Sequence, residues 1–595
     1  MTRRILPLLA LVVWLPDASA QVLDGYHDYE ALTSRLNQIV QANPQAARLQ
    51  SIGKTLQNRD IWVLELGTGR DRSERPALFV AANLEGNQLA GTELVLEAAG
   101  TLLADADLLA RRTFYLVPRA NPDGAQKAFA AVRAGSRTNT SAYDDDNDAR
   151  TDEDGPEDLN GDGLITVMRV ADPNGAYTAD EDEPRLMKKA DATKGESGTH
   201  SLYIEGTDND GDGYYNEDPA GGVDINRNFQ HEYPYYQADA GIHMVSERES
   251  RALMDFIVAH RNIAAILTYG ESDNLVTAPN DKGELGPAAG IDLETFAAAS
   301  NDGAREVGVF RTQTRRFFGF GGGSSAGQSG GRPSSGQRPA TTVSRDDLAY
   351  FTSVSEQYRE LTGLEATPPI RKPEGALFGY GYYQFGVPSF STPGWAPASG
   401  DSAAAAPARG GRRGGGASVD SKLLKWMESA GVDGFVDWAA FDHPQLGEVE
   451  IGGFAPYAAY NPPRAVLEDL SAQQGAFMSW LAGRTAQVGI AHTEVTDEGG
   501  GIFRIKAEVA NTGWLPTSTA HGVRSRSVKP TMVQLGIPPE DLLSGSAKTS
   551  FFQATDGSGR RQSFEWIIKG RRGDSVELRV VSQKGGTDTA TLTLR

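Results

Sequence analysis

The sequence predicts an α/β fold over most of its length, followed by an all-β domain at its C-terminal end. Between residues 23 and 484, apolar runs bounded by turns alternate with amphipathic helical patterns, which is typical of a mixed sheet flanked by helices. From about residue 488 the pattern changes to short alternating strands separated by Gly-rich turns. That change predicts a separate β-sandwich domain over 488–595.

The elements can be justified in chain order. Residues 23–43 carry apolar side chains at the spacing of an amphipathic helix, and residues 47–66 alternate as two strands around a polar turn. Residues 76–82 (PALFVAA) are continuously apolar, as expected for a strand buried on both faces. The same reasoning predicts a helix at 92–103, a strand at 113–118, a helix at 246–260, a strand at 263–269, a helix end and a buried strand within 379–395, and a helix at 466–482. In the second domain it predicts strands at 501–510, 549–553, 562–569, 574–582 and 587–594.

The composition of the chain limits its function classes. Residues 1–20 read as a secretory signal peptide, with Arg3 and Arg4 ahead of an apolar run and a small-residue cleavage site at Ala20. No later stretch is apolar enough to span a membrane, so we expect an exported protein, periplasmic or secreted. The net charge of −21 argues against nucleic acid as a partner. The chain has no Cys, which excludes disulfides, thiolate metal sites and thiol nucleophiles.

Two stretches lose all periodicity. Residues 317–342 are rich in Gly, Ser and Arg, and residues 396–417 are rich in Ala, Gly and Arg. Such compositions cannot bury a core, so both are predicted to be disordered insertions in the first domain.

An Asp-rich insertion at 144–218 contains three loops with alternating oxygen side chains. Oxygens at alternate positions let a loop wrap a hard cation, and a Gly at the sixth position permits the sharp turn. These loops resemble calcium loops of the EF-hand or dockerin type, which predicts structural calcium; the alternative is a solvated acidic loop. The candidate ligands are Asp144, Asp146, Asp148, Asp152, Asp158, Asn160, Asp162, Asp208, Asp210, Asp212 and Asn216.

The stretch 83–93 (NLEGNQLAGTE) joins the predicted strand 76–82 to the predicted helix 92–103. Open α/β sheets place their chemistry at such strand-to-helix turns. Further motifs are Asn121-Pro-Asp-Gly, Arg137-Thr-Asn, Asp224-Ile-Asn-Arg-Asn-Phe and Gly386-Val-Pro-Ser-Phe. Together with the turn, they resemble the zinc carboxypeptidases of the carboxypeptidase A and T superfamily over about residues 23–484. The resemblance implies a carboxypeptidase-like mixed sheet.

The resemblance also implies where the catalytic positions of that family fall. Family members bind zinc through His-x-x-Glu and a third His at the end of a later strand, and a separate Glu is the general base. In this sequence the three ligand positions and the base position are Glu85, Gln88, Gly270 and Pro393. An amide, a glycine and a proline supply neither a strong zinc ligand nor a base. Glu271 and Asp273 could add carboxylates, but oxygen ligands suit calcium or magnesium better than zinc.

The substrate-holding positions of the family are retained. Family members bind the terminal carboxylate of the substrate with Asn-Arg, which matches Asn226 and Arg227, and polarise the carbonyl with an Arg, which matches Arg137. A guanidinium fork suits a carboxylate because it donates two parallel hydrogen bonds. The mobile Tyr of the family corresponds to Tyr383 or its neighbour Tyr382.

Three hypotheses follow. The first is an exported, catalytically inactive homologue that binds peptide C-termini or similar carboxylates. The second is an active metallocarboxypeptidase with an atypical metal site. The third is a cell-envelope scaffold that uses the β-sandwich as its contact surface.

Overall fold

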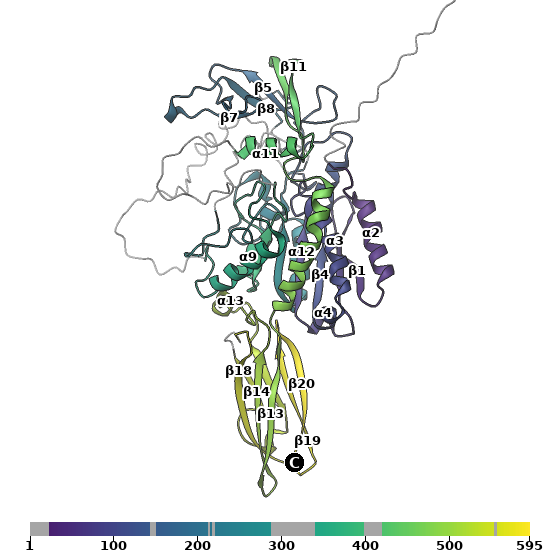
Figure 1. The fold of residues 1–595 in the computed structure, drawn as a ribbon, viewed down its shortest axis with the longest axis vertical. Helices are drawn as coiled ribbons and strands as arrows, with labels where there is room; N and C mark the ends of the chain where they lie inside the picture. The colour runs from purple at the N-terminus through teal and green to yellow at the C-terminus, as the bar shows by residue number, and fades with distance from the viewer. Residues whose placement is uncertain are drawn as a thin grey trace, which may run out of the picture.

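The computed structural model describes residues 23–142, 150–211, 213, 215–216, 221–286, 340–397, 419–551 and 556–595. The predicted signal peptide and nearly all of the two predicted disordered insertions lie outside these ranges. Figure 1 shows a central α/β body with a smaller sheet at one end of its long axis and the C-terminal β domain at the other. Among the helices in the described part of the chain, none has the length and apolarity needed to cross a membrane.

The central body is built on a six-stranded mixed sheet with the strand order β1-β2-β4-β3-β9-β10. The pairs β4–β3, β3–β9 and β9–β10 are parallel, while β1–β2 and β2–β4 are antiparallel. The strands are β1 Ala47–Lys54, β2 Asp60–Leu66, β3 Ala77–Ala82, β4 Thr113–Val117, β9 Ile263–Tyr269 and β10 Ser389–Thr392. This confirms the predicted mixed sheet.

Helices cover both faces of this sheet, and the alternation of side chains along β3 shows why. Leu78 and Val80 pack into the core on the side of α3 and α12, whereas Phe79 and Ala81 pack into the core on the side of α6 and α10. The period of two puts successive side chains on opposite faces, so both faces of β3 need a cover. The helices are α2 Tyr29–Ala42, α3 Ala90–Ala104, α4 Ala106–Arg111, α5 Pro122–Gln126, α6 Arg248–Ala259, α9 Leu348–Thr362, α10 Leu377–Tyr383, α11 Val419–Ser429, α12 Arg464–Arg484 and α13 Ala520–Ser525.

A second six-stranded sheet forms the smaller end body and was not predicted from the sequence. Its order is β11-β12-β5-β8-β6-β7. It pairs strands that are far apart in the chain, with Glu450 of β12 opposite Arg169 of β5 and a 2.8 Å ion pair between their side chains. The strands are β5 Val167–Ala171, β6 Tyr177–Ala179, β7 Met187–Lys189, β8 His200–Ile204, β11 Phe435–His443 and β12 Gly447–Phe454.

The C-terminal strands form two four-stranded sheets, ordered β13-β14-β18-β16 and β17-β15-β19-β20. Inward-facing residues such as Ile505, Val533 and Trp566 make a shared core, which confirms the predicted sandwich. The predicted strands overlap the observed ones, but β13, β15 and β16 were missed. The strands are β13 Val488–Gly499, β14 Ile502–Asn511, β15 Thr531–Gly536, β16 Leu542–Ser544, β17 Lys548–Phe551, β18 Arg560–Lys569, β19 Ser575–Ser582 and β20 Gly586–Thr593.

Candidate functional site

The turn after β3 has a fixed, buried backbone. Asn83 adopts a φ of 52° and its Nδ2 donates to the carbonyl of Glu85 at 2.8 Å. The N–H of Gly86 donates to the carbonyl of Arg137 at 2.6 Å. A Cβ on Gly86 would lie 2.9 Å from the backbone of Gly124, so only glycine fits at this close approach.

The turn brings Glu85 directly against Gly270, which follows β9. β3 and β9 are parallel neighbours, with Ala82 opposite Tyr269, so the residues after both strands meet at one edge of the sheet. A Cβ on residue 270 would lie only 2.6 Å from Oε2 of Glu85. The carboxylate of Glu85 therefore fills the space in which a side chain at position 270 would begin.

The carboxyl group of Glu85 is buried and only partly satisfied. Its Oε1 accepts hydrogen bonds from Nδ2 of Asn226 at 2.7 Å and from the N–H of Glu271 at 3.3 Å, while Oε2 has no partner in the described residues. Burial, together with the charges of Asp224 and Glu271, raises the pKa of Glu85 to about 8. Near neutral pH this carboxyl is therefore mostly protonated.

Three arginines, two of them buried and one partly exposed, are ion-paired to acidic side chains near Glu85. Nε of Arg137 lies 3.1 Å from Oε1 of Glu271. Nε of Arg227 lies 2.9 Å from Oδ1 of Asp239, and Gln237 accepts a further hydrogen bond from Arg227. The third arginine is Arg371, which was not recognised in the sequence.

Arg371 links the other members of the cluster. It is 2.8 Å from Asp224 and 3.1 Å from Asp239, and its Nε is 3.8 Å from Oε2 of Glu271. We call the seven residues the arginine cluster: Glu85, Arg137, Asp224, Arg227, Asp239, Glu271 and Arg371. It holds three guanidinium groups and four carboxyl groups, so its charges balance when Glu85 is protonated.

The other predicted site residues take different places. Gln88 is buried, and its Nε2 has no partner among the described residues. Pro393 follows β10, whose Thr392 accepts from the N–H of Gly270 at 3.1 Å, so the base position adjoins the turn. Asp273 instead accepts hydrogen bonds from the backbone of residues 275–277.

Besides the arginines, two further residues were expected to hold substrate, and both make contacts within the protein. Asn226 donates to Glu85 and accepts from the N–H of Leu377 at 3.0 Å. Tyr383 stacks on His231, with ring centroids 3.6 Å apart, and its carbonyl accepts from His521. Tyr383 thus packs toward the C-terminal domain.

These residues do not fit a zinc ion. Structural and catalytic zinc sites need three or four strong N, S or carboxylate ligands around one point. Within the described ranges, the one group of three or more His, Asp or Glu side chains whose ligand atoms lie within 4.8 Å of one another is Asp154, Asp208 and Asp210. None of these belongs to the turn, and the turn itself offers a neutral amide and a glycine at the expected ligand positions.

The Asp-rich loops are only partly described. Asp144, Asp146, Asp148 and Asp212 lie outside the described residues. Two predicted candidates, Asp208 and Asp210, come together with Asp154, a residue that the loop spacing did not select. The remaining candidates with described contacts form hydrogen bonds within the protein. Asp152 accepts from the N–H of Gly221, and Asp158 accepts from those of Gly161 and Gly163. Asp162 accepts from Asn160 Nδ2 and from the N–H of Leu164, Asn160 accepts from the N–H of Asp162, and Asn216 donates to the carbonyl of Ile204.

Comparison with known proteins gives a family for the central body. The family model described as zinc carboxypeptidase matches residues 32–354, and a domain of unknown function matches residues 487–593. A zinc carboxypeptidase of Saccharothrix mutabilis subsp. capreolus is 29% identical over 136 residues, covering 20% of this chain and 31% of that protein. Carboxypeptidase D of Mus musculus is 31% identical over 143 residues, covering 22% of this chain and 10% of that protein. The chain thus spans less than a third of the length of either relative.

Solved structures give a weaker likeness. Carboxypeptidase A from Helicoverpa armigera aligns with a TM-score of 0.27 and 20% identity, covering 44% of this chain and 50% of that one. A putative metallopeptidase from Shewanella amazonensis aligns with a TM-score of 0.21 and 14% identity, covering 47% and 82%.

Proposed function

The chain belongs to the zinc carboxypeptidase family, and from that premise we propose that it binds peptide C-termini or similar carboxylates without hydrolysing them. One observation carries the proposal: the carboxyl of Glu85 fills the space beside Gly270, and the acidic side chains around it are paired with three arginines. The proposed setting is the periplasm or the exterior, after removal of residues 1–20.

This chain lacks the side chains that the family uses to hydrolyse a peptide bond. Peptide hydrolysis needs a polarised carbonyl, an activated water and a base that takes its proton. Proline at position 393 cannot accept a proton. Glu85 is held by Asn226 and is mostly protonated near neutral pH, so its carboxyl is seldom free to accept a proton there. A bound peptide would therefore stay intact.

In the proposed function, Arg227 and Arg137 bind the carboxylate of the peptide. A free C-terminal carboxylate would replace Asp239 on the fork of Arg227, forming charge-assisted hydrogen bonds in a buried site. The exchange is limited in cost because Asp239 also pairs with Arg371 at 3.1 Å and would keep that partner. Asp239 is thus an internal competitor of the ligand.

Competition by Asp239 gives a prediction with opposite signs at two positions. In calorimetric titration with a short peptide bearing a free C-terminus, Arg227→Ala should weaken binding by about tenfold or more, because it removes the fork. Asp239→Asn should tighten binding by about fivefold, because it removes the competing charge. Arg169→Ala removes a similarly paired arginine in the end sheet and serves as the control.

The same peptide with an amidated C-terminus tests the chemistry of the ligand, and it should bind at least about tenfold more weakly. Equal affinity for the two peptides, or an Asp239→Asn variant that binds more weakly while remaining folded by circular dichroism, contradicts the proposal.

We also propose structural calcium in the Asp-rich insertion, supported by the convergence of Asp154, Asp208 and Asp210. Without a cation, three carboxylates at this spacing repel one another. Calcium accepts such oxygen ligands readily.

Metal analysis tests both metals in one measurement. We expect the purified protein to contain calcium, to lose thermal stability when a calcium chelator is added, and to contain no stoichiometric zinc. Asp208→Asn should reduce the effect of the chelator, whereas Asp497→Asn, near the end of β13, should leave it unchanged. Stoichiometric zinc that a chelator removes together with peptidase activity would overturn the non-hydrolytic function.

A further inference from the structure

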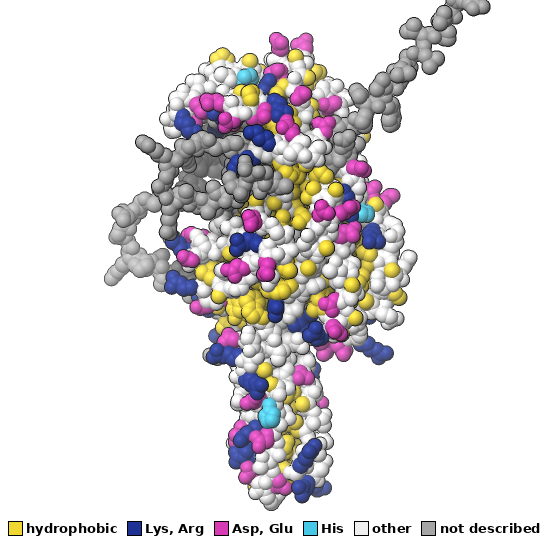
Figure 2. Space-filling model, in the orientation of Figure 1, with side chains coloured by type: hydrophobic (Ala, Val, Ile, Leu, Met, Phe, Trp, Pro, Cys, Tyr) yellow, Lys and Arg dark blue, Asp and Glu magenta, His cyan; other side chains and the backbone are white. Residues whose placement is uncertain are grey.

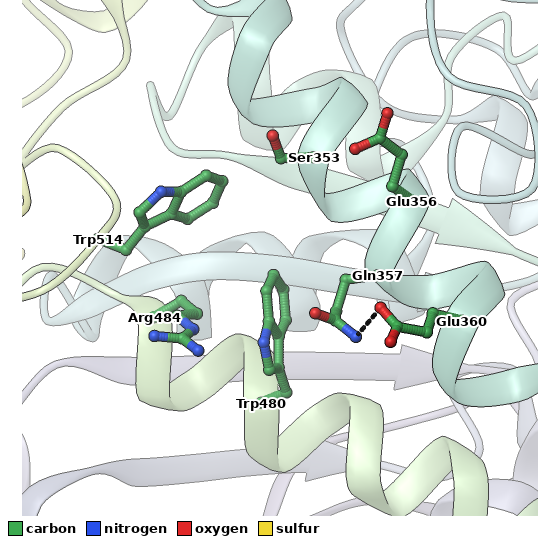
Figure 3. Close-up of a pocket in the computed structure, with 7 residues that line it drawn as sticks. All are labelled: Ser353, Glu356, Gln357, Glu360, Trp480, Arg484 and Trp514. Carbon is green, nitrogen blue, oxygen red and sulfur yellow. Dashed lines mark hydrogen bonds between the residues drawn. The ribbon is translucent and has the colours of Figure 1, made fainter.

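A groove lies where the C-terminal domain meets helices α9 and α12, and it shares no residue with the arginine cluster (Figure 3). Its volume is about 340 Å³, within the range of small-molecule sites, which often lie between domains. The lining residues are Ser353, Glu356, Gln357, Glu360, Trp480, Arg484 and Trp514.

Helical spacing brings these side chains to the groove. The four residues from α9, at positions 353, 356, 357 and 360, are separated by three, one and three positions. This spacing places them on one face of that helix. Trp480 and Arg484 are four residues apart on α12, so they also share a face. Trp514, from the segment after β14, closes the groove from the C-terminal domain (Figure 3).

The aromatic walls are held in place from behind. Trp480 stacks on Phe477 with ring centroids 6.2 Å apart and an interplanar angle of 17°. Trp514 meets Tyr350 edge-on at 5.2 Å. The two indoles are 6.2 Å apart at 51°, and both remain partly exposed. Figure 2 shows a hydrophobic patch on this side of the molecule, directly above the C-terminal sandwich.

The charged residues that line the groove limit the chemical class of ligand that it can bind. The lining includes two carboxylates, Glu356 and Glu360, and one guanidinium, so the groove disfavours an anion. The guanidinium of Arg484 lies 5.4 Å from the ring centre of Trp480 and occupies the position that a ligand cation would take. A purely apolar ligand would strip water from these charged groups without replacing their hydrogen bonds.

We infer that the groove binds a neutral saccharide. The C–H face of a sugar ring would lie on the exposed part of Trp514, beside Trp480, and its hydroxyls would donate to Glu356 and Glu360. Gln357 donates to Glu360 at 3.0 Å and holds that acceptor toward the groove. Since both domains supply walls, ligand binding would also stabilise the contact between them.

The test uses the full chain and the intrinsic fluorescence of its tryptophans. Cellobiose, maltose and di-N-acetylchitobiose are titrated as neutral probes, with tetramethylammonium chloride and sodium phosphate as charged ones. At least one saccharide should bind saturably, Trp514→Ala should weaken it by about tenfold, and Glu356→Gln by about threefold. Glu468→Gln, an exposed change on α12 outside the groove, should leave affinity unchanged.

Three results would overturn the inference: binding of none of the three saccharides, binding of a charged probe alone, or equal saccharide affinity in the wild type and in folded Trp514→Ala. Because the groove is separate from the arginine cluster, Arg227→Ala should not alter saccharide binding, and the failure of either proposal can be told from that of the other.

Discussion

Replacing Glu85 by glutamine is expected to remove much of the loss of stability that the wild-type protein undergoes between about pH 5 and pH 8. The pKa of Glu85 is raised to about 8 in the folded protein by burial and by the neighbouring carboxylates, whereas it is near 4.3 in an unfolded chain.

The sign follows from proton binding. Between these two pKa values the folded state holds a proton that the unfolded state has lost, so stability falls as pH rises. Each pH unit inside the window costs up to about 1.4 kcal/mol, and we expect wild type and Glu85→Gln to diverge by about 3 kcal/mol across it. The glutamine keeps the shape of the protonated acid and does not titrate.

Thermal unfolding at a series of pH values checks this expectation. Asp224, whose burial raises its pKa to about 6, retains part of the slope in the variant. Glu468→Gln, on the exposed side of α12, is the control and should follow the wild-type curve. Parallel curves for wild type and Glu85→Gln would show that the carboxyl is ionised in the folded protein throughout this range.

Replacing Gly375 by alanine is expected to lower the thermal unfolding midpoint strongly and to disturb the arginine cluster. Gly375 has a φ of 71°, and a Cβ there would lie 2.2 Å from the carbonyl oxygen of Arg227. Its carbonyl also accepts from the N–H of Phe229 at 2.9 Å, so it braces the turn that carries Arg227. Relief requires backbone movement, which should cost about 3 kcal/mol or more.

A second glycine separates backbone strain from collision. Gly363 ends α9 with a φ of 69°, but a Cβ there meets nothing within 4 Å. Gly363→Ala should therefore cost only about 1 kcal/mol, the price of a left-handed conformation. Gly375→Ala should in addition weaken binding of the carboxylate peptide, while Gly363→Ala should not. Similar losses of stability in the two variants would mean that the backbone at Arg227 moves away from the added Cβ at little cost in free energy.

The sequence was most informative where chemistry is local. The apolar run before the turn predicted β3, and the residue types at positions 85, 88, 270 and 393 already indicated that the family's zinc and base positions are changed. Their proximity was an expectation of the resemblance; the structure shows Glu85 against Gly270 and Pro393 adjoining it.

The end sheet shows the opposite limit. Its strands come from residues 167–204 and 435–454. The residue pattern of neither segment predicts that it pairs with the other. Hydrogen bonds between distant strands are made by the backbone, which is the same in every residue. The sequence therefore read the first segment only as an acidic insertion.

Glu85, Gln88, Gly270 and Arg227 could be selected by the sequence itself, because residue type fixes which ligand, proton or charge a side chain can offer. Only the tertiary structure decided what those side chains do to one another. Asp239 and Arg371 carry no local signal, yet they set the charge around Arg227. The physical reason is that a buried charge is governed by its neighbours in space, since the interior screens it poorly.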